Sequence, residues 1–88
     1  MRGEGDGMSI EDQLRVFIAD ETHVESPAAL TDDYPLIERG VVDSMGILNI
    51  VSFIEREYGI EVQDEELVQR NFGTISSMAK LIDSKREA

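Results

Sequence analysis

The sequence predicts an all-α domain of four helices, three longer and one short, with a long loop between the first and the second. Three stretches repeat apolar residues at steps of three and four positions, which places those residues on one face of a helix. No stretch alternates apolar and polar residues around a hairpin turn, so strands are not expected. At 88 residues, the chain is short enough to form one domain around one core.

The first predicted helix follows a segment that has little to pack. Residues 1–8 are expected to be disordered, because the first seven include three glycines and no large apolar residue after Met1. Ser9 followed by Asp12 resembles a capping box with Asp in place of Glu, and predicts a helix from Ile10 to Glu21. Apolar residues fall at helical spacing within it, at Ile10, Leu14, Phe17 and Ile18.

Residues 23–42 are predicted to form the long loop. They include both prolines, Pro27 and Pro35, and their apolar residues show no sustained period. Loops longer than about 12 to 15 residues are uncommon in compact domains and are often functional. The scattered apolar residues indicate that this loop is pinned over the core, and a short helical turn is compatible with the residues around Leu36.

The second helix is predicted from Met45 to Tyr58, and the residues at both of its ends fit. Asp43 is suited to the N-cap position, and Gly59 to the position after the last turn, where a left-handed conformation costs glycine little. Ser44 then lies in the first turn. The wide apolar stripe of this helix consists of Ile47, Leu48, Ile50, Val51, Phe53, Ile54 and Tyr58.

Two further helices are predicted in the last third of the chain. Asp64 to Arg70 could form one short helix, and Thr74 is suited to cap a final helix. The apolar residues of that final helix are Ile75, Met78, Ala79, Leu81 and Ile82. Residues 85–88 are mostly charged and are expected to fray, which leaves residues 9–84 as the folded domain.

The charge of the chain excludes several kinds of partner. Lys and Arg number 8 against 19 Asp and Glu, a formal net charge of −11 that repels phosphate backbones and anionic lipid surfaces. We therefore expect neither nucleic acid nor a membrane as a partner. The chain has no cysteine and no apolar run long enough to span a bilayer, so we expect a soluble, cytoplasmic protein. We also expect it to be a monomer.

Few residues could support catalysis or bind a metal. His23 is the only histidine, and its neighbours supply neither a second ligand nor a partnered nucleophile, so it receives no role. The acidic pair Asp32 and Asp33 and the acidic run 64–66 lack calcium-loop spacing and fit turns and helix starts better. A phosphate-binding glycine loop, a zinc motif and a complete Ser/His/Asp arrangement are all absent from the sequence. We predict no catalytic residue and no metal site.

Ser44 is the remaining candidate, and its surroundings carry a resemblance. The stretch Gly-Val-Val-Asp-Ser-Met at 40–45, followed by an amphipathic helix, resembles the modification site of the acyl carrier and peptidyl carrier family, whose signature is Asp-Ser-Leu or Asp-Ser-Met. Three further blocks match that family in order, at 36–40, 59–62 and 71–75. The resemblance covers residues 9–84 and identifies them as a carrier domain.

The resemblance implies a four-helix bundle of the acyl carrier type that is not itself an enzyme. A separate phosphopantetheinyl transferase would use magnesium to move 4′-phosphopantetheine from coenzyme A to Ser44, with Asp43 as signature residue and helix cap. The arm would hold an acyl or aminoacyl group as a thioester, so the missing cysteine is no obstacle. An acyl- or aminoacyl-activating ligase would load the arm, and downstream acyl-processing enzymes would take the cargo.

The resemblance also places a partner-binding face on the second helix. Met45 and Leu48 are candidate apolar contacts, although core packing is an equal alternative for Leu48. Carriers of fatty acid synthesis usually have acidic residues where this chain has Gly46 and Asn49, so these two positions are expected to affect partner choice. Asp-Ser-Met-Gly is instead similar to D-alanyl carriers and to free-standing carriers that serve amino acid activating ligases. This favours specialised metabolism or amino acid activation.

Two other functions are compatible with the same residues. The chain could be an unmodified four-helix interaction module in which Ser44 only begins a helix, and Ser44→Ala would then have little effect. It could also be a small hydrolase with Ser44 as nucleophile and His23 as base. Hydrolysis of a model ester that is lost in His23→Ala would support that third function.

Overall fold

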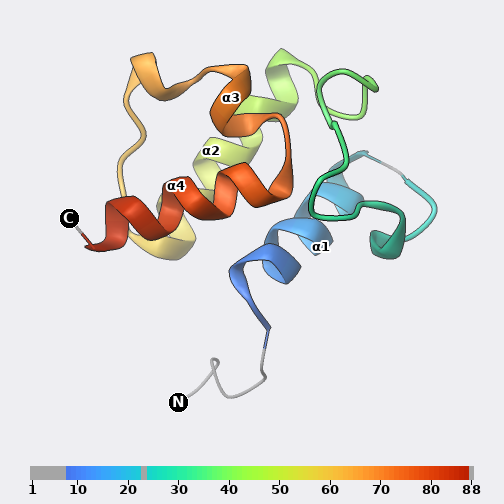
Figure 1. The fold of residues 1–88 in the computed structure, drawn as a ribbon, viewed down its shortest axis with the longest axis horizontal. Helices are drawn as coiled ribbons and strands as arrows, with labels where there is room; N and C mark the ends of the chain where they lie inside the picture. Colours follow the sequence, from blue (N-terminus) through green and yellow to red (C-terminus); the bar gives the residue numbers. More distant parts are fainter. Residues whose placement is uncertain (1–7, 23, 88) are drawn as a thin grey trace.

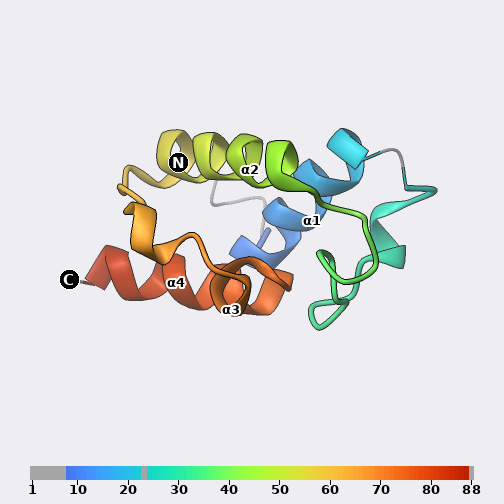
Figure 2. The same cartoon turned by 90° about the horizontal axis from the view of Figure 1, so that it is seen from above.

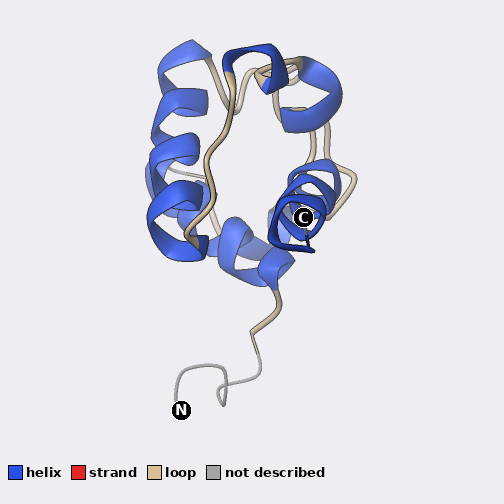
Figure 3. Cartoon of the chain, turned by 90° about the vertical axis from the view of Figure 1, so that its left-hand side faces the viewer, coloured by secondary structure: helices blue, strands red, loops and turns tan. Residues whose placement is uncertain are grey.

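The computed structural model describes residues 8–22 and 24–87. The helices are α1 (Ile10–Thr22), the 3₁₀ turn η2 (Pro27–Ala29), α2 (Ser44–Tyr58), the 3₁₀ turn η3 (Asp64–Glu66), α3 (Gln69–Phe72) and α4 (Ile75–Glu87). Among the described residues there is no strand, and loops alone join the helices (Figures 1 and 3). The predicted all-α class, with three longer helices and one short one, is confirmed.

The long helices begin where the predicted capping residues stand. Ser9 Oγ accepts a hydrogen bond of 3.0 Å from Asp12 N at the start of α1. At the start of α4, Thr74 Oγ1 accepts one of 3.0 Å from Ser77 N. These bonds satisfy N–H groups that have no partner inside the helix, which fixes the first turn of each helix.

The short helix predicted from Asp64 to Arg70 is instead two separate pieces, η3 and α3. The chain is extended at Val68, with φ of −126° and ψ of 157°. Glu66 accounts for the break, because its side chain accepts a 2.8 Å hydrogen bond from Gln63 N, while its backbone oxygen accepts one of 2.9 Å from Asn71 Nδ2. Both bonds close η3 as a single turn.

The final helix continues past the end predicted at Ser84. Residues 85–87 form its last turn. Lys85 lies 2.8 Å from Glu66, measured from Nζ to Oε1, and this ion pair holds the last turn of α4 against η3. Residues 1–7, His23 and Ala88 lie outside the described residues, and the disorder predicted for 1–8 concerns mostly that part.

The core is formed by all four α-helices and by the loop between α1 and α2. In Figure 2, α2 and α4 lie on opposite sides of the domain and α1 crosses between them. The buried residues are Leu14, Ile18, Ala19, Leu30, Leu36, Val42, Ile50, Ile54, Phe72, Ile75, Met78, Ala79 and Ile82. Three of them (Leu30, Leu36 and Val42) belong to the loop, which confirms that the loop is pinned over the core. No described helix is long and apolar enough to cross a membrane.

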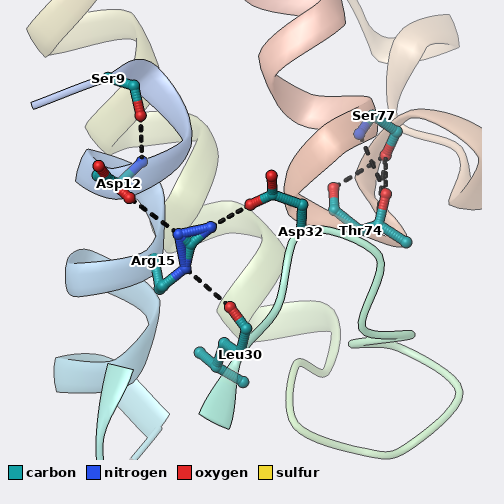
Figure 4. A network of polar contacts seen from close by, with 7 residues as sticks. All are labelled: Ser9, Asp12, Arg15, Leu30, Asp32, Thr74 and Ser77. Atoms are coloured by element: carbon teal, nitrogen blue, oxygen red, sulfur yellow. Dashed lines mark hydrogen bonds and ion pairs between the residues drawn. The ribbon is translucent and has the colours of Figure 1, made fainter. Parts of the chain in front are cut away.

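Arg15 fastens this loop to α1 (Figure 4). Its Nε donates a 2.8 Å hydrogen bond to the Leu30 backbone oxygen, and its guanidinium forms ion pairs with Asp12 and Asp32. The Asp32 backbone oxygen accepts a 2.9 Å hydrogen bond from Ser76 N at the start of α4. Asp32 thus joins the loop to α1 and to α4, and its carboxylate is paired with Arg15.

Candidate functional site

Ser44 is exposed and is the first residue of α2. Asp43 precedes it in an extended conformation, with φ of −108° and ψ of −170°, and its Oδ1 accepts a 2.8 Å hydrogen bond from Gly46 N. The predicted N-cap is therefore confirmed. Because the chain turns from extended to helical between these two residues, the Ser44 side chain lies at the outermost end of the helix.

The first turn of α2 leaves two backbone donors open beside Ser44. Gly46 N donates to the Asp43 side chain, and Ile47 N donates to the Asp43 backbone oxygen over 2.9 Å. Within the described residues, the N–H groups of Ser44 and Met45 have no acceptor. Open N–H groups and the positive end of a 15-residue helix favour a phosphate group at this position, by roughly 0.3 to 1 kcal/mol when exposed.

The segment that leads to Ser44 is fixed by buried anchors. Leu36 is fully buried; its N–H donates to the Gly73 backbone oxygen over 2.8 Å, and its own backbone oxygen accepts from Val41 and Val42. Gly40 reverses the chain between these bonds with a φ of 76°, a conformation that costs other residues about 1 to 2 kcal/mol. The turn predicted near Leu36 is confirmed by a 2.9 Å bond from Arg39 N to the Pro35 oxygen.

The residues around Ser44 differ in the direction they face. Met45 is 65% exposed and Leu48 52% exposed, so Leu48 lies on the surface rather than in the core. Asn49 is also exposed, and its Nδ2 donates a 3.3 Å hydrogen bond to Glu21 Oε1 on α1. At Gly46, a Cβ atom would lie 3.2 Å from Val42 Cγ1, so this position faces the domain rather than the solvent.

The groups with shifted pKa values lie away from Ser44. Burial, aided by the Glu57 carboxylate, raises the pKa of Tyr58 to about 12 at the opposite end of α2. The hydrogen bond from Lys85 lowers the pKa of Glu66. His23, the histidine of the hydrolase hypothesis, lies outside the described residues, and those that are described contain no cluster of three acidic or histidine side chains suited to a metal.

Comparison with known proteins identifies the family. Residues 12–82 match the family described as the phosphopantetheine attachment site. The chain belongs to this carrier family. As a carrier protein, it has covalent 4′-phosphopantetheine as its cofactor, held on a serine, and carriers of this kind are in general non-catalytic.

Two individual proteins are similar to this carrier. The probable acyl carrier protein PigG of Serratia sp. (strain ATCC 39006) is 34% identical over 53 residues, which are 60% of this chain and 61% of PigG. The chain thus matches about three fifths of that relative's length. A chain in the crystal structure of an FAD-dependent dehydrogenase superposes with a TM-score of 0.69 and 25% identity, over 77% of this chain and 96% of its own.

Sequence reasoning singled out Asp43 and Ser44 because a cap and a signature are local features, and the structure confirms the cap at Asp43. It missed Glu21 and Arg15, whose contacts to Asn49 and to the loop depend on how α1 packs. In the sequence, Leu36 stands out only as an apolar residue in a polar loop. Its hydrogen bond to Gly73 could not be predicted, because the two residues are far apart in the sequence.

Proposed function

We propose that Ser44 is the serine that carries 4′-phosphopantetheine, and that the arm holds an acyl or aminoacyl group as a thioester for partner enzymes. The observation that carries the proposal is the position of Ser44, exposed at the first residue of α2 beside two open N–H groups. A phosphodiester formed there would accept hydrogen bonds from those groups and lie at the positive end of the helix.

The residues around Ser44 present it rather than activate it. Asp43 holds the first turn through Gly46 N, and buried Leu36 and Val42 fix the chain just before it. In the proposed reaction a separate phosphopantetheinyl transferase supplies the catalytic groups, and this chain supplies an accessible hydroxyl. Tethering then raises the effective concentration of the cargo at each enzyme that docks.

The proposed partners are the transferase, an acyl- or aminoacyl-activating ligase and downstream acyl-processing enzymes, all in the cytoplasm. The similarity to a chain from the structure of an FAD-dependent dehydrogenase makes a flavin-dependent dehydrogenase one candidate among those downstream enzymes. The uncharged residues Gly46 and Asn49, of which Asn49 is the exposed one, favour specialised metabolism or amino acid activation over fatty acid synthesis. We place the carrier domain at residues 9–84 and add the last turn of α4 to it.

Intact-protein mass spectrometry tests the role of Ser44. The protein is incubated with coenzyme A, magnesium and a broad-specificity transferase, and we expect one added phosphopantetheine on the parent chain. Ser44→Ala should gain none, whereas Ser52→Ala, which removes another exposed hydroxyl of α2, should be modified like the parent. No gain on folded parent protein would leave the unmodified interaction module as the better explanation.

A further inference from the structure

The helices α1 and α2 run antiparallel and meet along a seam of three side-chain contacts. Asn49 binds Glu21, Phe53 stacks on Phe17 at a ring-centroid distance of 4.2 Å, and the Tyr58 hydroxyl donates to Gln13. As the chain moves down α2 from one contact to the next, the partner on α1 moves back by four residues. The seam therefore extends from near Ser44 to the far end of α2.

The outer side of this seam is an apolar groove with an acidic rim. The groove has a volume of about 490 Å³. The apolar residues that line it are Met8, Phe17, Phe53 and Val16, of which Val16 is 48% exposed. The exposed residues Asp20 and Glu57 also line it, and neither has an ion-pair partner among the described residues. A partner protein with an exposed apolar side chain between Lys or Arg residues would be complementary to the apolar and acidic residues of this groove.

The seam also supplies a charge that the upper part of α2 lacks. From Ser44 to Phe53 the helix contains no charged residue, although the chain has a net charge of −11. The carboxylate of Glu21, held by Asn49, is contributed to this face by α1. Asn49 lies about 7.5 Å along the helix axis from Ser44 at ~1.5 Å per residue. Glu21 is therefore within the area that an enzyme covering Ser44 would contact.

We propose that the transferase that modifies Ser44 docks on this seam, with an apolar side chain in the groove and Arg or Lys beside Glu21. A specific interface buries about 800 Å² on each partner, so an enzyme centred on Ser44 extends beyond α2. Complementary charge at the edge of such an interface speeds encounter. The inference rests on the proposed carrier function, since it assigns a docking surface to the enzyme that the function requires.

Steady-state kinetics of Ser44 modification test the seam. Initial rates are measured against the concentration of the unmodified carrier for the parent, Glu21→Gln, Val16→Ser and Asn49→Ala. We expect KM for the carrier to rise about fivefold in the first two variants and less in Asn49→Ala, with kcat within twofold of the parent, because docking changes and the hydroxyl does not. At ~1 M salt, where charges are screened beyond about 3 Å, the effect of Glu21→Gln should vanish while that of Val16→Ser persists.

The matched control is Asp83→Asn, which removes one exposed carboxylate from α4 and changes the net charge as Glu21→Gln does. Its KM should equal that of the parent. Unchanged KM in all seam variants, or an equal rise in Asp83→Asn, would overturn the docking surface. So would a dimer of the parent that Val16→Ser separates without changing KM, because the groove would then belong to a second copy. A parent that is never modified refutes the carrier function itself.

Discussion

Gly59 determines where α2 ends. It adopts the left-handed conformation, with φ of 66° and ψ of 30°, and its N–H donates a 3.0 Å hydrogen bond to the Glu55 backbone oxygen. Apart from Gly59 and its two chain neighbours, no described residue has an atom within 4 Å of the position that a Cβ would take, so a side chain there would meet backbone strain rather than a clash. The turn after α2 thus depends on the conformational freedom of one residue.

We expect Gly59→Ala to lower the free energy of unfolding by about 1 to 2 kcal/mol, because alanine is strained in the left-handed region. Gly59→Asn should cost less, since asparagine tolerates that conformation better. Urea unfolding followed by circular dichroism measures both. An alanine variant as stable as the parent would show that the turn relaxes to another conformation.

At the level of single residues, the sequence predicted what local chemistry decides. Asp43 and Gly59 were identified as helix ends because a cap and a left-handed turn each require particular side chains at the position itself. The pairing of Asn49 with Glu21 could not be predicted, because the two residues become neighbours only when α1 packs on α2. The exposure of Leu48 was open for the same reason: the apolar stripe of α2 is wider than the face it buries.

Among the helices, α2 depends most directly on its cap, since Asp43 both begins the helix and precedes the exposed serine. We expect Asp43→Ala to lower the free energy of unfolding by about 1 kcal/mol, and Asp43→Asn to lower it little, because asparagine caps helices about as well. Chemical denaturation of both variants measures the difference. Equal losses in the two would indicate that the carboxylate charge matters rather than the hydrogen bond to Gly46 N.

The elements that sequence reasoning misplaced are those whose ends are set by particular side-chain contacts rather than by the apolar pattern. The break between η3 and α3 follows from Glu66, which binds Gln63 and Asn71 near it and Lys85 on α4. The ion pair between Lys85 and Glu66 lies in the last turn of α4, which ends at Glu87. Periodicity alone reveals neither boundary, because the first depends on the hydrogen bonds of Glu66 and the second on the contact between α4 and η3.

At the level of the whole molecule, Tyr58 joins three helices. Its hydroxyl donates to Gln13 on α1, its ring meets Phe53 edge-on at 6.4 Å, and the guanidinium of Arg86 on α4 lies 5.7 Å from the ring centroid. Burial raises the pKa of Tyr58 to about 12, above its ordinary value of 10.0. The folded protein therefore keeps the proton at a pH where the unfolded chain has lost it.

The sign of this shift predicts a loss of stability in alkali. Between pH 10 and about 12 the unfolded state releases the Tyr58 proton first, so the free energy of unfolding should fall as pH rises through this range. Tyr58→Phe lacks the proton and should show a shallower fall, even though it starts less stable without the bond to Gln13. Urea unfolding of both proteins across this range measures the difference. A stability gap that stays constant with pH would contradict the assignment.

The hydrogen bond between Leu36 and Gly73 has a consequence for synthesis. A ribosome makes the loop and α2 before it reaches Gly73, so the anchor behind Ser44 has no partner while the first half of the chain emerges. In the same way, the backbone oxygen of Asp32 has no hydrogen-bond donor until Ser76 has been made. The loop before Ser44 can form both bonds only after α3 and the start of α4 have been translated and have packed against it. The final position of Ser44 therefore depends on correct folding of segments that are made after it.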